Sequence, residues 1–154
     1  MIVLDKIDKM ILSLLQNNAH LTIKEIASQV NISLTPVHER IKKMENEGII
    51  EKYVTVLNKK KLGQSLIVYC NISLFKQSAD DFNIFNETIS HLPEVVESSV
   101  VSGAFDYIIK IIVPDMDAYY LFHQQKLANI KCVSTINSFF VMNEVKNTTA
   151  IPLL

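Results

Sequence analysis

Residues 22–48, TIKEIASQVNISLTPVHERIKKMENEG, are the most informative stretch of the chain because they predict two helices joined by a tight turn. Thr22 and Glu25 have the spacing of a capping box, in which a threonine and a glutamate three residues later each satisfy a free backbone N–H. Apolar residues then recur at helical spacing, until Asn31 and Ser33 interrupt them with side chains that favour turns and caps. The stretch is therefore typical of a helix-turn-helix unit.

The second of these helices begins near Ser33 or Thr35 and carries Pro36 in its first turn, where a missing N–H costs nothing. Gly48 is its expected stop. At about 100° per residue, the face opposite its apolar stripe presents polar and charged side chains. The stripe consists of Val37, Ile41 and Met44, and the outward side chains are Thr35, Glu39, Lys42 and Lys43, flanked by His38 and Arg40.

A helix of this kind fits the major groove of B-DNA, where its N-terminal half usually reaches the bases. We therefore predict a DNA-binding surface, although an ordinary solvated helix face is the simpler alternative. The side chains expected in the groove are Ser33, Thr35, His38, Glu39 and Lys42, and those expected at phosphates are Lys24, Arg40 and Lys43.

A further amphipathic helix precedes this pair. Asp5 is its expected cap, with Asp8 three residues further on. The apolar residues that follow the rule for one buried face are Ile7, Met10, Ile11, Leu14 and Leu15. After Gly48, residues 49–57 are β-rich and predict either a wing or the strand that leads out of the unit.

The composition indicates a globular protein, with 49% hydrophobic and 20% charged residues among 154. The net charge is −1, but residues 1–63 hold ten basic and seven acidic side chains, whereas residues 64–154 hold five and nine. This asymmetry confines an expected nucleic-acid contact to the first part of the chain. Neither a membrane helix of roughly 18 apolar residues nor a signal peptide is predicted, so a cytoplasmic location is expected. Cys70 and Cys132 are expected to be buried, reduced thiols.

The periodicity changes from helical to extended near Ser65, which predicts a helix-turn-helix domain over 1–50, a β-rich linker over 51–64 and a second domain over 65–154. The expected segments of the second domain are a strand at 66–75, a helix at 80–92, strands at 95–102 and 106–113, a helix at 115–128 and a strand at 132–145. This β-α-β-β-α-β order is the ferredoxin-like arrangement, with both helices on one face of a four-stranded antiparallel sheet. The predicted fold class is α+β, with a winged-helix-like first domain.

Both faces of the predicted sheet are apolar. In the first strand, Val68 and Cys70 point to one side, while Ile67, Tyr69 and Phe75 point to the other. A sheet covered on only one side normally alternates more cleanly between apolar and polar side chains. The second face therefore predicts a partner surface, most simply another copy of the chain, and hence a homodimer.

The sequence has no recognisable catalytic or metal-binding pattern. The four histidines are scattered, there is no Cys-x-x-Cys pair, and three glycines leave no phosphate-binding loop. Carboxylate pairs at Asp80-Asp81 and Asp115-x-Asp117 lie at expected helix starts, where capping explains them. We expect no enzyme activity, no cofactor and no metal.

These features together resemble the Lrp/AsnC family of bacterial and archaeal transcription regulators over nearly the whole chain. The first helix, the helix after the tight turn and one turn of the second domain carry the resemblance. The matching motifs are Leu4-Asp5-x-x-Asp8-x-x-Ile11-Leu12-x-x-Leu15-Gln16, Ile32-Ser33-x-Thr35-Pro36-Val37-x-Glu39-Arg40-Ile41-x-x-Met44-Glu45-x-x-Gly48-Ile49-Ile50, and Val101-Ser102-Gly103-x-Phe105-Asp106-Tyr107 with Val113-Pro114-Asp115-Met116.

The resemblance implies DNA-binding dimers, often assembled into octamers, with an amino-acid effector bound between subunits of neighbouring dimers. Asp106 would either face the ammonium of the effector or cap the turn at 103–105, two roles to which we give equal weight. Met116 and Phe139 would either wall an apolar pocket or pack in an interface. The effector residues carried over from the resemblance are Val100, Gly103, Asp106, Met116, Phe139, Phe140 and Val141.

The sequence thus predicts a DNA-binding transcription regulator whose DNA affinity or assembly changes when a small amino acid binds. Two alternatives are open. One is an enzyme on the same scaffold, since some relatives decarboxylate tetrapyrroles, for which His123 is the one candidate residue. The other is an amino-acid-sensing interaction module that does not bind DNA.

Overall fold

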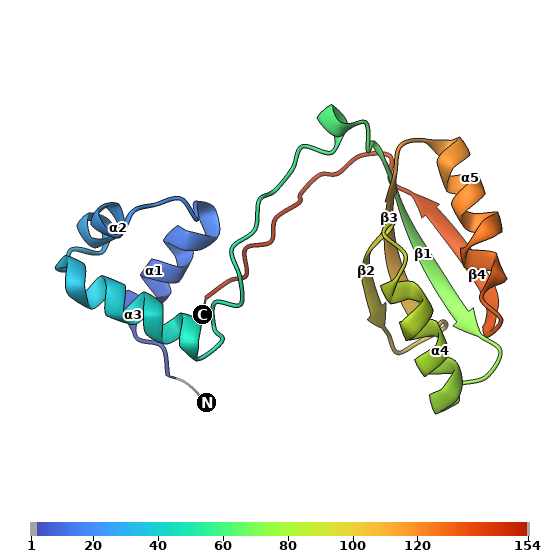
Figure 1. Ribbon diagram of the computed structural model, residues 1–154, viewed down its shortest axis with the longest axis horizontal. Helices are drawn as coiled ribbons and strands as arrows, with labels where there is room; N and C mark the ends of the chain where they lie inside the picture. The colour runs from blue at the N-terminus through green and yellow to red at the C-terminus, as the bar shows by residue number, and fades with distance from the viewer. Residues whose placement is uncertain (1–2, 154) are drawn as a thin grey trace. The chain divides into compact units, whose positions relative to one another are not determined.

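The computed structural model describes residues 3–153 and divides into two compact units (Figure 1). The N-terminal unit comprises the described residues up to Val56 together with those from Lys146 onward, and the C-terminal unit spans Leu57–Val145. The sequence placed the whole of 65–154 in the second domain. The structure differs at the end of the chain, where the residues from Lys146 onward belong to the N-terminal unit. Hydrophobic periodicity in the sequence does not indicate these contacts.

The N-terminal unit consists of α1 (Lys6–Asn17), α2 (Ile23–Val30) and α3 (Leu34–Asn46). Both expected capping boxes are present, since Asp5 accepts the backbone N–H of Asp8 and Thr22 accepts that of Glu25, with the reciprocal bonds also made. The hydrogen bonds from Thr22 lower the pKa of the Glu25 carboxyl. The two boxes therefore fix where α1 and α2 begin.

The three helices share one apolar core. Val37, Ile41 and Met44 of α3 are buried, as the sequence predicted. On α1 the prediction was partly wrong: Met10 is 38% exposed, whereas Leu12 is buried. The reason is that Leu12 packs into the helix core, while Met10 lines a groove beside residues 150–153 of the returning chain.

The segment after α3 is extended but forms no strand. Gly48 has a left-handed φ of 70°, and residues 51–58 have neither helix nor strand structure. The Tyr53 hydroxyl donates a hydrogen bond of 2.9 Å to Glu45, which ties this segment back to α3. Burial, together with Glu45, raises the pKa of Tyr53 to about 12. The predicted wing or strand at 49–57 is thus not formed within the described chain.

The C-terminal unit contains η1 (Lys60–Leu62), β1 (Leu66–Leu74), α4 (Ala79–Ser90), β2 (Val95–Val100), β3 (Tyr107–Val113), α5 (Met116–Gln125), η2 (Leu127–Asn129) and β4 (Val133–Phe140). The strand order is β2-β3-β1-β4, and every neighbouring pair is antiparallel. The predicted ferredoxin-like order is confirmed. The fourth strand is shorter than the expected 132–145, since pairing with β1 ends at Phe140.

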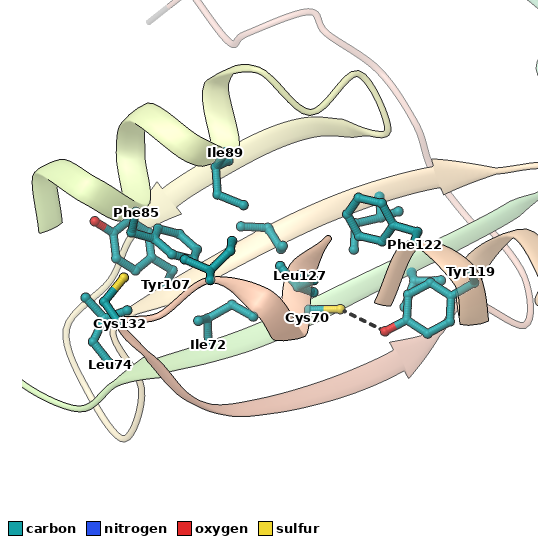
Figure 2. Packing of buried hydrophobic residues seen from close by; sticks show 14 of the residues in the cluster. Cys70, Ile72, Leu74, Phe85, Ile89, Tyr107, Tyr119, Phe122, Leu127 and Cys132 are labelled. Carbon is teal, nitrogen blue, oxygen red and sulfur yellow. Dashed lines mark hydrogen bonds between the residues drawn. The ribbon is translucent and has the colours of Figure 1, made fainter. Parts of the chain in front are cut away.

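One face of this sheet carries the core of the unit. Burial alternates along β3 from Tyr107 to Val113, and the buried residues face α4 and α5 (Figure 2). Cys70 and Cys132 are free and buried, as expected, and burial raises the pKa of the Cys70 thiol. The helix residues that fill the core are Phe85 and Ile89 from α4 and Tyr119 and Phe122 from α5.

The other face of the sheet is less uniformly apolar than the sequence predicted. Tyr69 and Ile112 lie on it, half-buried, but the same face also bears Asn71 and Lys110. The Lys110 ammonium pairs with Glu97 of the neighbouring strand at 3.0 Å. No helix of the C-terminal unit packs on this face, because the buried residues of both helices belong to the opposite side.

The turn between β2 and β3 is held to β1 by Asp106. Its carboxylate is 6% exposed and accepts the backbone N–H of Leu74 and the side-chain N–H of Gln77, both at 2.7 Å. The Asp106 backbone N–H donates to Ile72, and its carbonyl accepts the N–H of Val101. The residue therefore joins three segments of the chain through both its side chain and its backbone.

These contacts predict that Asp106→Ala destabilises the C-terminal unit. The buried N–H of Leu74 would lose its acceptor, at a cost of about 1–3 kcal/mol. Asp106→Asn should retain most of the stability, because its amide oxygen can accept from Leu74 while the Gln77 amide turns to present its oxygen. Urea unfolding of the two variants and wild type measures the difference. Equal stability of the alanine variant and wild type would show that the turn does not need this carboxylate.

Candidate functional site

The residues predicted to contact DNA form an exposed surface of the N-terminal unit. Lys24 lies on α2, and the others follow α3 from its N-cap, with Val37 and Ile41 buried on the opposite side. The exposed side chains are Lys24, Ser33, Thr35, His38, Glu39, Lys42 and Lys43. The α2–α3 turn positions this surface, since Asn31 takes the left-handed conformation that lets the chain reverse after α2.

In the described structure, the N-terminus of α3 has no capping hydrogen bond from the side chain of its N-cap residue. Asp5, Thr22, Ser78 and Asp115 each accept a backbone N–H at the helix that they precede, whereas within residues 3–153 the Ser33 side chain makes no such capping bond. The first N–H groups of α3 are therefore available to an outside acceptor such as a phosphate.

Arg40 does not join the exposed surface as the sequence predicted. Its Nη1 lies 2.6 Å from carboxylate oxygens of both Asp5 and Asp8, at the start of α1. These two partners raise the pKa of the guanidinium. The pKa of the Asp5 carboxyl is lowered, first by the backbone N–H of Asp8 and then by Arg40. In this geometry Arg40 holds α1 against α3, and a contact of Arg40 with a phosphate stays a prediction.

Sequence reasoning missed Leu34. It is the first residue of α3 and is 51% exposed, between Ser33 and Thr35. A large apolar side chain at the groove-facing end of such a helix suits the methyl group of thymine. Its place between Ser33 and Thr35 was the available signal, although at about 100° per residue it lies close in angle to the apolar stripe.

The predicted effector residues of the C-terminal unit form two groups. The first lies at the turn between β2 and β3, where Val100 is 59% exposed and Gly103 has a φ of 141° that glycine favours. Asp106 belongs to the same turn, but its carboxylate is already engaged by Leu74 and Gln77. These contacts hold the turn to β1 rather than cap residues 103–105, and a contact of Asp106 with the effector ammonium stays a prediction.

The second group lies where β3 and β4 end. Met116 begins α5 and is 54% exposed, and Phe139 is 53% exposed at the end of β4. The side chain of Phe140 lies on the opposite, helix-covered face of the sheet. Its ring contacts that of Tyr119 edge-on, with 5.2 Å between the ring centroids. The backbone N–H of Val141 donates to Ile67, which fixes this corner to the start of β1.

The two groups are at opposite ends of the sheet. In the β1–β3 register, Tyr107 pairs with Ile72 and Val113 pairs with Leu66. The six residue steps of β3 between them span about 20 Å of extended strand. In a single protomer, Gly103 and Met116 therefore lie too far apart to contact the same free amino acid. A site that includes both residues does not form within one chain.

The described residues offer little for other chemistry. Among residues 3–153, no three His, Cys, Asp or Glu side chains gather as a metal site. In that same range no helix has the length and apolar character needed to cross a membrane. His123 lies on α5, with its ring 6.0 Å from that of Tyr119.

Comparison with known families matches both units. A profile described as winged helix-turn-helix DNA-binding matches residues 4–51, and a profile described as Lrp/AsnC ligand binding domain matches residues 67–151. The first match contains all of α1, α2 and α3, and the second contains the four-stranded sheet except Leu66, the first residue of β1.

Individual relatives agree. The leucine-responsive regulatory protein of Escherichia coli is 36% identical over 148 residues, covering 96% of this chain and 90% of the relative. A solved transcriptional regulator of Neisseria meningitidis in complex with L-Met has a TM-score of 0.94 and 31% identity, covering 97% of both chains. An AsnC family transcriptional regulator of Agrobacterium tumefaciens has a TM-score of 0.92 and 35% identity, again with 97% coverage of both. The relatives are transcriptional regulators rather than enzymes, and this chain is a DNA-binding transcription regulator that belongs to the Lrp/AsnC family.

Proposed function

We propose that the protein binds specific DNA sequences through the exposed face of α3 and that a small amino acid modulates this binding. The observation that carries the proposal is the exposed row of polar side chains along α3, inside a segment matched by a DNA-binding profile. Ser33, Thr35, His38, Glu39 and Lys42 would reach base edges, with Leu34 against a thymine methyl. Lys24 and Lys43 would hold phosphates. Such a regulator acts on the chromosome, so we place it in the cytoplasm.

The protein acts, in this proposal, as a homodimer or a larger assembly such as an octamer. The face of the sheet without helices carries Tyr69 and Ile112, which a second copy would shield from water. A two-fold dimer presents two copies of α3, which read half-sites about one helical turn apart. The paired DNA contacts would then multiply the modest affinity of one helix.

The effector is, in this proposal, a free amino acid with an apolar side chain, bound between protomers. Support comes from the separation of the two groups of effector residues, since the Gly103 turn of one protomer can complete the Met116 and Phe139 corner of another. The relative of Neisseria meningitidis was solved with L-Met, a ligand of this class. Gly103 lets a carboxylate approach the main chain, and Met116 and Phe139 offer apolar walls.

The DNA-binding half of the proposal predicts a change in salt dependence for Lys43→Ala. Removing one phosphate contact should weaken binding across sequences and lower the slope of log affinity against log salt by about one. Fluorescence anisotropy on a duplex selected by the wild type from a random pool measures the slope. Lys131→Ala, which removes an exposed lysine of the C-terminal unit, is the matched control. An unchanged slope for Lys43→Ala would remove it from the interface, and no duplex selected at all would favour an interaction module without DNA.

The effector half predicts that L-methionine binds and that Met116→Ala weakens it. Truncating a side chain that walls an apolar pocket should cost about tenfold in affinity. Calorimetry of the two proteins gives the ratio, with Met142→Ala as the control because that methionine is 95% exposed. Equal affinities for Met116→Ala and wild type would exclude Met116 from the site, and no heat from the wild type would exclude L-methionine as effector.

A further inference from the structure

The C-terminal segment is docked on the first helix of the N-terminal unit. The Gln16 side chain donates to the carbonyl of Ile151 at 3.2 Å and accepts the Ile151 N–H at 2.7 Å. A glutamine amide that both donates to and accepts from one residue imitates the pairing of two strands. Residues 146–153, which we term the strap, have neither helix nor strand structure, and these two bonds dock the strap on α1 at Ile151.

The strap has an apolar anchor as well. Leu153 is half-buried and packs against the cluster that contains Ile11, Val37 and Ile41. A groove of about 350 Å³ remains between α1 and the strap, and Ile151 itself is 67% exposed. A docking contact that lies beside unfilled space and leaves Ile151 exposed is of the kind that opens locally without global unfolding.

In the sequence, the strap follows the proposed effector corner after a few residues. β4 ends at Phe140, and Val141 is bonded to Ile67. The Lys59 ammonium donates hydrogen bonds to both carboxylate oxygens of Glu144, at 2.9 and 2.8 Å. Lys59 lowers the pKa of this carboxyl. Six residues separate Glu144 from the docked Ile151, so the chain is held once before the strap begins and once within it.

From α1 the contact continues to the DNA-reading helix. The start of α1 holds Arg40 of α3 through Asp5 and Asp8, each at 2.6 Å. Ile11 of α1 and Ile41 of α3 belong to the same buried cluster that Leu153 touches. A change in the position or order of α1 therefore acts on α3 through two contacts, one ionic and one apolar.

We propose that the strap controls the order of α3. When docked, it holds α1, and through α1 it holds the DNA-reading face; displacement of the chain after β4 undocks it and loosens that face. This role deepens the proposed function, because it gives an amino acid bound near Met116 and Phe139 a covalent route to the N-terminal unit. The device is a local order–disorder equilibrium that the effector biases.

The experiment compares wild type with Gln16→Ala and Leu153→Ala in the full chain. Hydrogen exchange followed by mass spectrometry should be faster by about fivefold or more in peptides of α1 and α3, and unchanged in β1. DNA affinity on one selected duplex should fall in parallel. Thr149→Ala alters an exposed residue of the strap outside its docking contacts and should behave as wild type. Gln16→Ala removes only a half-buried side-chain amide, so it tests the strap without emptying the core.

If both variants show the same hydrogen exchange and the same DNA affinity as wild type, the proposal that the strap controls the order of α3 is wrong. L-methionine added to wild type provides the second comparison, in which exchange at residues 146–153 should change together with DNA affinity. A change in DNA affinity with constant exchange at 146–153 would overturn the strap as the route. If L-methionine has no effect on exchange or DNA affinity, it is not the effector of the proposed function. The comparison of the variants with wild type would still test whether the strap controls the order of α3.

Discussion

The antiparallel register between β1 and β3 is the constraint on which the rest of this regulator depends. It sets Tyr107 beside Ile72 at one end of the sheet and Val113 beside Leu66 at the other. The glycine turn before β3 and the methionine that begins α5 are thus kept about 20 Å apart by a rigid strand. A free amino acid cannot bridge that distance, so a site that uses both groups must be built from two chains.

In the proposed function, effector binding and assembly would be coupled. An effector that completes its site only between protomers stabilises the assembly that forms the site, and by linkage the assembly raises the affinity for the effector. Coupling energies of this kind are typically about 1–3 kcal/mol, which gives a graded response to amino-acid supply. In the proposed assembly, the helix-free face of the sheet would form the contact within a dimer, and the exposed corner would form the contact between dimers.

Local sequence rules were sufficient wherever the determining contact was local. The capping boxes at Asp5 and Thr22, the buried stripe of α3 and the βαββαβ order each follow from a spacing of a few residues. Long-range partners were not predictable in this way. The sequence did not indicate that Asp5 and Asp8 lie beside Arg40, or that Leu74 and Gln77 donate hydrogen bonds to Asp106. The strap was missed because an extended segment without periodicity does not indicate which surface it will contact.

Mixing two disabled proteins tests the shared site most directly. Val100→Lys places a charge at one end of the sheet and Met116→Lys at the other, both at exposed apolar positions. Each variant alone should bind no L-methionine by calorimetry. A co-refolded equal mixture should recover about one quarter of the wild-type sites, because one site in four then joins two intact ends from different chains. A mixture that binds no more than its separate components would contradict the account.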